Sequence, residues 1–172
     1  MKNIYFTVGP SQLYPTVLRH LQTAMKLHIG SLSHRSKGFE ELYEETSVNL
    51  RTLLGIPKTH HLFFLSSSLE AMERTIENTV AGQSLHLMTG DFGQKFYDTA
   101  LKLGKKPKIH LLPPGSLDKV TSLRVTSQTE LLCVTQNETS TGIAIPPEMI
   151  YMFKKQNPNL LVALDVVSSV PY

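Results

Sequence analysis

Three polar segments of this 172-residue sequence could do chemistry at a ligand site. Residues 66–68 are consecutive serines that follow an apolar run and precede a helical pattern. Small hydroxyl groups and free backbone N–H groups at a helix start favour an anion, especially a phosphate. Asp165 follows a strongly apolar run, and its carboxylate could hold a cationic nitrogen through a charge-assisted hydrogen bond. Both have structural alternatives, because Ser68 could merely cap its helix and Asp165 could end a strand with its hydrogen bonds satisfied.

The third polar segment is residues 137–142, Asn-Glu-Thr-Ser-Thr-Gly, which includes Thr139 and offers several hydrogen-bonding groups. Such a loop is most often only a turn. Phe92, in the segment Gly-Asp-Phe-Gly, begins a helical pattern after another apolar run, although core packing is its more ordinary role. His34 and Arg35 precede a helical pattern, and a guanidinium there suits a carboxylate or other oxyanion, although a surface position fits equally well.

Other residues point away from several classes of enzyme. The remaining histidines near apolar runs lack the spacing of metal ligands, so we expect packing or surface roles for them. Cys133 is the single cysteine, and its apolar context Glu-Leu-Leu-Cys-Val-Thr predicts a buried strand residue rather than a nucleophile. The sequence contains no GxGxxG, GxxxxGK[ST] or GxSxG motif, so nucleotide-dependent and α/β-hydrolase chemistry lose their main support.

Apolar runs alternate with helical patterns along the chain, which predicts an α/β fold with a mostly parallel sheet flanked by helices. Ligands of such sheets bind at the carboxyl ends of the strands, where all the polar segments named above except His34 and Arg35 are expected. The run at 160–164 is expected to be buried on both faces. The predicted strands are residues 61–65, 84–88, 108–112, 131–135 and 160–164, and the predicted helices are 14–27, 37–54, 69–80, 92–103 and 147–155.

Composition indicates a folded protein that binds neither nucleic acid nor a membrane. The chain is 41% hydrophobic with ten Gly and ten Pro, which excludes a disordered or collagen-like chain. A net charge of +3 is weak, and we interpret the lysines at 105, 106 and 108 as a solvated turn rather than a nucleic-acid patch. No apolar run is long enough for a membrane helix or a signal peptide, so we expect a cytoplasmic protein.

Taken in chain order, six segments resemble the class V, fold-type I pyridoxal-phosphate aminotransferases, the group that contains phosphoserine aminotransferase and the alanine (serine)–glyoxylate enzymes. The segments are residues 6–11, 33–39, 66–73, 90–94 and 137–144, together with Asp165 and the serine pair 168–169. The resemblance covers the whole chain. It implies that residues 1–30 form an N-terminal arm and first helix, and that residues 31–172 form the front part of the large, cofactor-binding domain of a homodimeric enzyme.

The resemblance also implies a role for each matching residue. Ser67, Ser68 and Leu69 would hold the phosphate of pyridoxal 5'-phosphate, and Phe92 would stack on its pyridine ring. Thr139 would hydrogen-bond near the ring hydroxyl, and Asp165 would pair with the pyridinium nitrogen and so assist catalysis. His34 and Arg35 would lie near the acidic end of the substrate.

The implied reaction is transfer of an amino group from an L-amino acid to a 2-oxo acid, with O-phospho-L-serine and 2-oxoglutarate, as in serine biosynthesis, as the expected pair. An alanine/serine–glyoxylate reaction is the enzymatic alternative, because the phosphoserine branch usually has Arg where this chain has Leu69. The Schiff-base lysine implied shortly after Asp165 is absent from residues 166–172, which suggests the front part of a longer protein. It also leaves open a non-catalytic module that binds a phosphorylated ligand.

Overall fold

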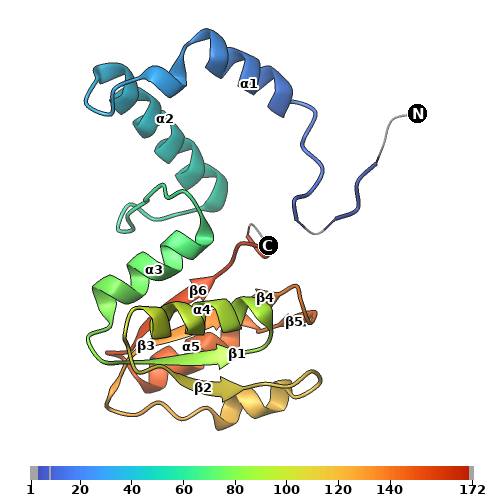
Figure 1. Ribbon diagram of the computed structural model, residues 1–172, viewed down its shortest axis with the longest axis vertical. Helices are drawn as coiled ribbons and strands as arrows, with labels where there is room; N and C mark the ends of the chain where they lie inside the picture. Colours follow the sequence, from blue (N-terminus) through green and yellow to red (C-terminus); the bar gives the residue numbers. More distant parts are fainter. Residues whose placement is uncertain (1–3, 8, 171–172) are drawn as a thin grey trace. The chain divides into compact units, whose positions relative to one another are not determined.

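The computed structural model describes residues 4–7 and 9–170, which form two compact units (Figure 1). Unit 1 is Met1–Phe63 and unit 2 is Phe64–Tyr172. Val8 of the 6–11 segment, residues 1–3 of the predicted arm, and Tyr172 lie outside the described residues. The predicted boundary between an N-terminal arm with the first helix (residues 1–30) and the large domain (residues 31–172) stays a prediction.

Unit 1 is helical. It contains α1 (Val17–Lys26), a 3-10 turn η1 (Ile29–Ser31) and α2 (Lys37–Leu54), and none of these three elements contains a buried residue. Ser36 caps α2 by accepting a hydrogen bond from the Phe39 N–H, and Gly55 ends it at φ 63°, where a residue without a Cβ adopts a left-handed conformation at little cost. The Arg51 guanidinium donates to the carbonyl oxygens of Pro57 and His60, which fixes the loop after α2.

Unit 2 is an α/β layer structure, which confirms the predicted fold class. Its parallel sheet has the strand order β2-β1-β3-β6, and β4 and β5 form a separate antiparallel pair. The elements in chain order are α3 (Ser68–Thr79), β1 (Gln83–Met88), α4 (Asp91–Lys102), β2 (Lys108–Leu111), η2 (Leu117–Ser122), β3 (Thr129–Thr135), β4 (Asn137–Glu138), β5 (Ile143–Ala144), α5 (Pro147–Gln156) and β6 (Leu161–Asp165).

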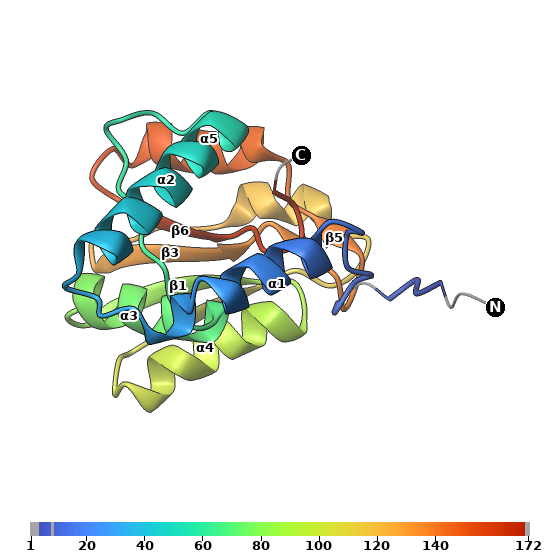
Figure 2. The same ribbon diagram turned by 90° about the horizontal axis from the view of Figure 1, so that it is seen from above.

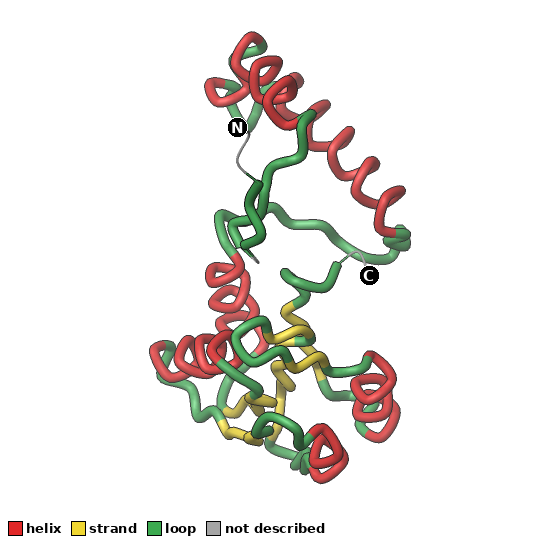
Figure 3. The backbone as a smooth tube through the Cα atoms, turned by 90° about the vertical axis from the view of Figure 1, so that its right-hand side faces the viewer, coloured by secondary structure: helices red, strands yellow, loops and turns green. Residues whose placement is uncertain are grey.

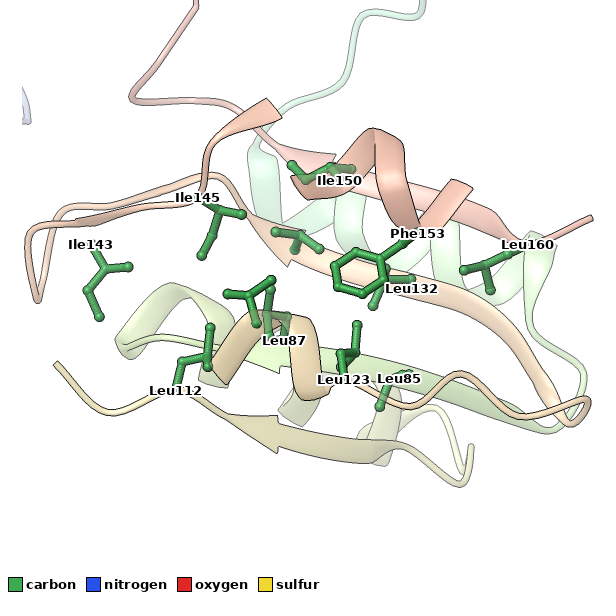
Figure 4. Close-up of a cluster of buried hydrophobic side chains, with 12 residues drawn as sticks. Leu85, Leu87, Leu112, Leu123, Leu132, Ile143, Ile145, Ile150, Phe153 and Leu160 are labelled. Atoms are coloured by element: carbon green, nitrogen blue, oxygen red, sulfur yellow. The ribbon is translucent and has the colours of Figure 1, made fainter. Parts of the chain in front are cut away.

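Helices cover both faces of this sheet (Figures 2 and 3). Side chains of β3 alternate between the faces, so Leu131 and Cys133 pack with residues of α3 and α4, while Leu132 and Val134 pack toward α5. The cluster on the α5 face is the larger one, and Figure 4 shows Phe153 and Ile150 of α5 above Leu132 and Leu87 of the sheet. Burial on both faces explains the apolar run in β3, whereas β1 also buries two polar residues, Ser84 and His86, which hydrogen-bond to one another.

Two strand predictions are wrong in their details. Residues 61–65 form a loop, and Phe63 is 80% exposed, because no strand within the described residues pairs with this segment. The run at 160–164 is not buried on both faces: β6 is an edge strand of the described sheet, and Leu161 and Leu164 are 47% and 43% exposed. An apolar run becomes a buried strand only when a neighbouring strand and covering helices are in place.

Candidate functional site

The candidate site lies at the edge of unit 2 where the parallel strands end. Figure 1 shows the carboxyl ends of β1, β3 and β6 at the same edge as the amino ends of α3 and α4. Because each helix returns antiparallel to the strand that follows or precedes it, this edge collects strand ends, loops and helix starts. These segments of unit 2 contain all the predicted cofactor-binding residues: Ser67, Ser68, Leu69, Phe92, Thr139 and Asp165.

At the amino end of α3, the cap is Ser67 rather than Ser68. The Ser67 hydroxyl oxygen accepts a hydrogen bond from the Glu70 N–H at 3.1 Å. The Glu70 carboxylate turns back and accepts from both the N–H and the hydroxyl of Ser66, at 2.9 and 2.6 Å. These hydrogen bonds lower the pKa of Glu70, the hydroxyl contributing most. The arrangement is a variant of the capping box and starts the helix at Ser68.

This cap leaves anion-binding groups available. Among the described residues, the N–H groups of Ser68 and Leu69 and the hydroxyl of Ser68 have no hydrogen-bond partner. They stand at the positive end of a 12-residue helix and are exposed. Leu69 is 49% exposed and brings no charge to this position. Three donors at a helix start are suited to a phosphate group.

The amino end of α4 is already filled. The Oε2 atom of Glu138 accepts hydrogen bonds from the N–H groups of Phe92 and Gly93, each at 3.0 Å. The Ser140 hydroxyl accepts from the Asp91 N–H at 3.0 Å and donates to Oε1 of Glu138 at 2.6 Å. The first three N–H groups of α4 are therefore satisfied by side chains from the loop after β3, and this helix start offers no free donors to an anion.

Gly90 is required for that cap because the loop approaches it closely. A Cβ atom at Gly90 would lie 2.7 Å from Cγ and 2.8 Å from Cδ of Glu138, and closer still to Oγ of Ser140. The Thr141 hydroxyl also donates to the carbonyl oxygen of Thr89 at 2.9 Å. The β1–α4 loop and the loop after β3 are thus joined by side-chain hydrogen bonds.

Phe92 and Thr139 lie on the two segments that this cap joins. Phe92 is partly exposed, and the Lys95 ammonium lies 4.5 Å from its ring centroid. Thr139 is half-buried and stands between Glu138 and Ser140. The structure therefore brings together the segments of these two predicted ligand-binding residues, which are 47 positions apart in the chain.

Asp165 ends β6, and its side chain keeps one free oxygen. Oδ1 accepts from the Val167 N–H at 3.2 Å, while Oδ2 has no hydrogen-bond partner in the part of the chain that is described. Alternation places Asp165 on the same face of the sheet as Ala163, which packs with the α3–α4 cluster. The carboxylate thus faces the side of the sheet on which α3 begins.

His34 and Arg35 belong to unit 1, in the exposed turn before α2. The Arg35 N–H donates to the Ser33 hydroxyl at 3.3 Å. They belong to a different unit from the other predicted site residues, and their role near a substrate stays a prediction.

Sequence reasoning did not assign Glu138 a role, and it missed buried hydroxyls at the strand ends. The hydroxyls of Thr89 and Thr135 are buried without a hydrogen-bond partner among the described residues, as is Oε1 of Gln136. A native structure contains few such atoms, and they are common where a ligand or water completes the hydrogen bonding. The only sequence signal for Glu138 is an acidic residue three positions after an apolar strand, a signal that an ordinary turn also produces.

Two titratable side chains are buried away from this edge. Burial lowers the pKa of His86 to about 4, so the imidazole is neutral near pH 7 and accepts or donates only one hydrogen bond, with the Ser84 hydroxyl at 2.9 Å. Burial raises the pKa of the Cys133 thiol, which keeps it protonated and unreactive. Both residues have the packing roles that the sequence predicts.

The described residues contain no cluster of three or more His, Cys, Asp or Glu that could hold a metal ion. Nor does any helix in the described ranges combine the length and apolar character that crossing a membrane requires.

Comparison with known proteins relates the whole chain to one family. A family model described as "Aminotransferase class-V" matches residues 4–172. The phosphoserine aminotransferase of Lactococcus lactis subsp. cremoris is 30% identical over 160 residues, covering 83% of this chain and 44% of that protein. A solved structure of a phosphoserine aminotransferase from Cytophaga hutchinsonii is 43% identical, with a TM-score of 0.92 over 98% of this chain and 47% of that one.

A second solved structure belongs to another branch. It is an alanine–glyoxylate aminotransferase from Nostoc sp., 27% identical with a TM-score of 0.76 over 95% of this chain and 43% of that one. The chain spans about half the length of the relatives that it matches.

Proposed function

Since the chain belongs to the class-V aminotransferase family, we propose that it forms the cofactor-binding part of an enzyme that moves an amino group between an L-amino acid and a 2-oxo acid, with pyridoxal 5'-phosphate as cofactor. The proposed enzyme is a homodimer, in which His34 and Arg35 lie near the acidic end of the substrate.

The donors and acceptors at the strand edge fit this cofactor. The free N–H groups of Ser68 and Leu69 and the Ser68 hydroxyl suit its phosphate, with Ser67 holding the helix start in place. Phe92 supplies an aromatic face for the ring, and Thr139 supplies a hydroxyl for the ring oxygen. The free Oδ2 of Asp165 suits a protonated ring nitrogen. When bound, a cofactor with a protonated ring withdraws electrons from the substrate as its α-proton leaves.

The observation that carries the proposal is the difference between the two helix starts. The amino end of α4 is filled by the Glu138 carboxylate, whereas that of α3 keeps free donors. One open anion site, on the same edge as a carboxylate with a free oxygen, matches a ligand that is an anion at one end and a ring cation at the other.

O-Phospho-L-serine and 2-oxoglutarate are the substrates that we propose. Support comes from the names of two relatives, the proteins of Lactococcus lactis and Cytophaga hutchinsonii. The specific observation that favours the glyoxylate-type reaction instead is Leu69, which supplies no positive charge at a position where the phosphoserine branch usually has Arg.

The test is a substrate comparison on the full-length protein. We expect the protein to form glutamate when it is given O-phospho-L-serine and 2-oxoglutarate. We expect it to form little glycine when it is given glyoxylate with either L-serine or L-alanine. Activity with glyoxylate alone would replace the phosphoserine proposal, and failure with both pairs would remove the transaminase proposal. Full-length protein that retains no pyridoxal phosphate after dialysis would contradict the cofactor assignment independently of substrate.

A further inference from the structure

The cap of α4 comes from a distant part of the chain. Phe92 and Gly93 donate to Oε2 of Glu138, and Asp91 donates to Ser140, across 45 to 49 residues of sequence. Gly90, at the usual cap position, has no side chain to do this. The capping pair Glu138 and Ser140 therefore replaces a local cap.

The Glu138 carboxylate is strongly held. It is 0% exposed, and its two oxygens together accept four hydrogen bonds: two from α4 and two from Ser140, through its N–H at 3.3 Å and its hydroxyl at 2.6 Å. A buried carboxylate with all its acceptor positions used, at the positive end of a helix, resists displacement. The absence of a Cβ at Gly90 leaves the space that these two side chains occupy.

The capping hydrogen bonds involve Phe92 itself and the two residues that flank Thr139 in the chain, and Phe92 and Thr139 are the residues expected beside the cofactor ring. Phe92 is itself a donor to Glu138, and Thr139 lies between Glu138 and Ser140 in the chain. We infer that Glu138 is a positioning residue, which sets the place of the Phe92 ring relative to the Thr139 hydroxyl and thereby the fit of the cofactor ring between them. This inference rests on the proposed function, since it concerns the same site.

The inference is tested on the full-length protein with three variants of the capping pair and one control. Glu138→Ala removes all four hydrogen bonds, Ser140→Ala removes the hydroxyl's bonds only, and Glu138→Gln keeps an acceptor for Phe92 and Gly93. The control is Glu148→Gln, at an exposed position of α5 where the side chain makes no hydrogen bond or ion pair with the residues that the structure describes. The measured quantity is the dissociation constant of pyridoxal phosphate, at a temperature where circular dichroism shows every variant to be folded.

We expect the dissociation constant to rise about tenfold or more in Glu138→Ala and several-fold in Ser140→Ala, with Glu138→Gln between Glu138→Ala and wild type. Glu148→Gln should match wild type. The visible circular dichroism of the bound cofactor should weaken in the same order, because it reports the asymmetry of the ring's surroundings. Amide exchange at Phe92 and Gly93 should accelerate in the cofactor-free protein.

A purely structural cap gives a different pattern, in which the melting temperature falls while the dissociation constant and the visible circular dichroism stay at wild-type values. That pattern would overturn the inference. If Glu138→Ala does not fold, Ser140→Ala and Glu138→Gln decide the question by the same criterion. Wild-type protein that binds no pyridoxal phosphate would instead overturn the proposed function, and the two failures are therefore distinct.

Discussion

Thr135 and Asp165 lie opposite one another, in register, at the carboxyl ends of β3 and β6. The Thr135 hydroxyl is buried without a partner among the described residues, and Oδ2 of Asp165 is free. A hydrogen bond from the Gln136 N–H to the Asp165 carbonyl oxygen, at 2.9 Å, continues the pairing beyond the strands. The sheet thus ends in polar atoms without a partner among the described residues, on strands that are paired with one another, which is what a ligand subsite requires.

Replacing Asp165 with Asn should weaken pyridoxal phosphate binding in the full-length protein by roughly 10- to 100-fold, because a neutral amide oxygen replaces the charged acceptor for the protonated ring nitrogen. Equilibrium dialysis measures the affinity. Asp118→Asn, on the exposed turn η2, is the matched control. Equal affinities for the two variants would remove Asp165 from the site.

The two serines at the start of α3 should behave differently. Ser67→Ala should lower the free energy of unfolding by about 1 kcal/mol, because the cap is lost. Ser68→Ala should leave stability unchanged and weaken binding of inorganic phosphate by roughly fivefold, because only a free hydroxyl is lost. Urea unfolding and phosphate titration separate the two effects. Reversed results would show that Ser68, not Ser67, is the structural residue.

Leu69→Arg tests the departure of this chain from the phosphoserine branch. The side chain is half-exposed, so a longer one can be accommodated, and an added guanidinium should tighten phosphate binding by roughly tenfold. Isothermal calorimetry at low salt is the measurement. An unchanged affinity would show that the phosphate is held away from this helix start.

Gly90→Ala should destabilise the protein by about 1–3 kcal/mol, since its Cβ would overlap Glu138 and Ser140. Gly82→Ala is the control, because a Cβ there meets nothing within 4 Å. Chemical denaturation compares them. Equal stabilities would mean that the loop after β3 can move away from Gly90 at little cost.

Burial of His86 should make the fold sensitive to acid. Its pKa is depressed to about 4 in the folded protein and is ordinary, near 6.5, in the unfolded chain, so the unfolded state binds more protons between these values. The stability that depends on neutral His86 is fully present above pH 6.5. It is lost as the pH falls toward 4, which lowers the free energy of unfolding by up to about 3 kcal/mol. Urea unfolding of His86→Leu should show a flatter dependence on pH across this window. A slope equal to that of wild type would place the titration elsewhere.

The parallel sheet was predictable because β1 and β3 are buried on both faces, and long apolar runs between turn residues have few other interpretations. Residues 61–65 are equally apolar, but no strand among the described residues pairs with them, and composition carries no information about neighbouring strands. The sequence predicted helix α3 to start at residue 69 with Ser68 as the candidate cap, within one residue of the observed start, because serines before acidic residues are a local signal of a helix start. The cap by Glu138 could not be predicted from the sequence, because its donors lie 45 and 46 residues away and no local rule connects them.

The remote cap of α4 has a consequence for synthesis on the ribosome. When residues 91–102 have left the exit tunnel, their first turn still has unsatisfied N–H groups, and it stays frayed until residues 138–140 have also emerged. The first turn of α4 can therefore form stably only after the ribosome has synthesised the chain past β3 and the capping residues. Truncated chains that end between residues 110 and 135 should therefore expose this turn to proteases after their release from the ribosome, whereas chains that extend well beyond residue 140 should protect it.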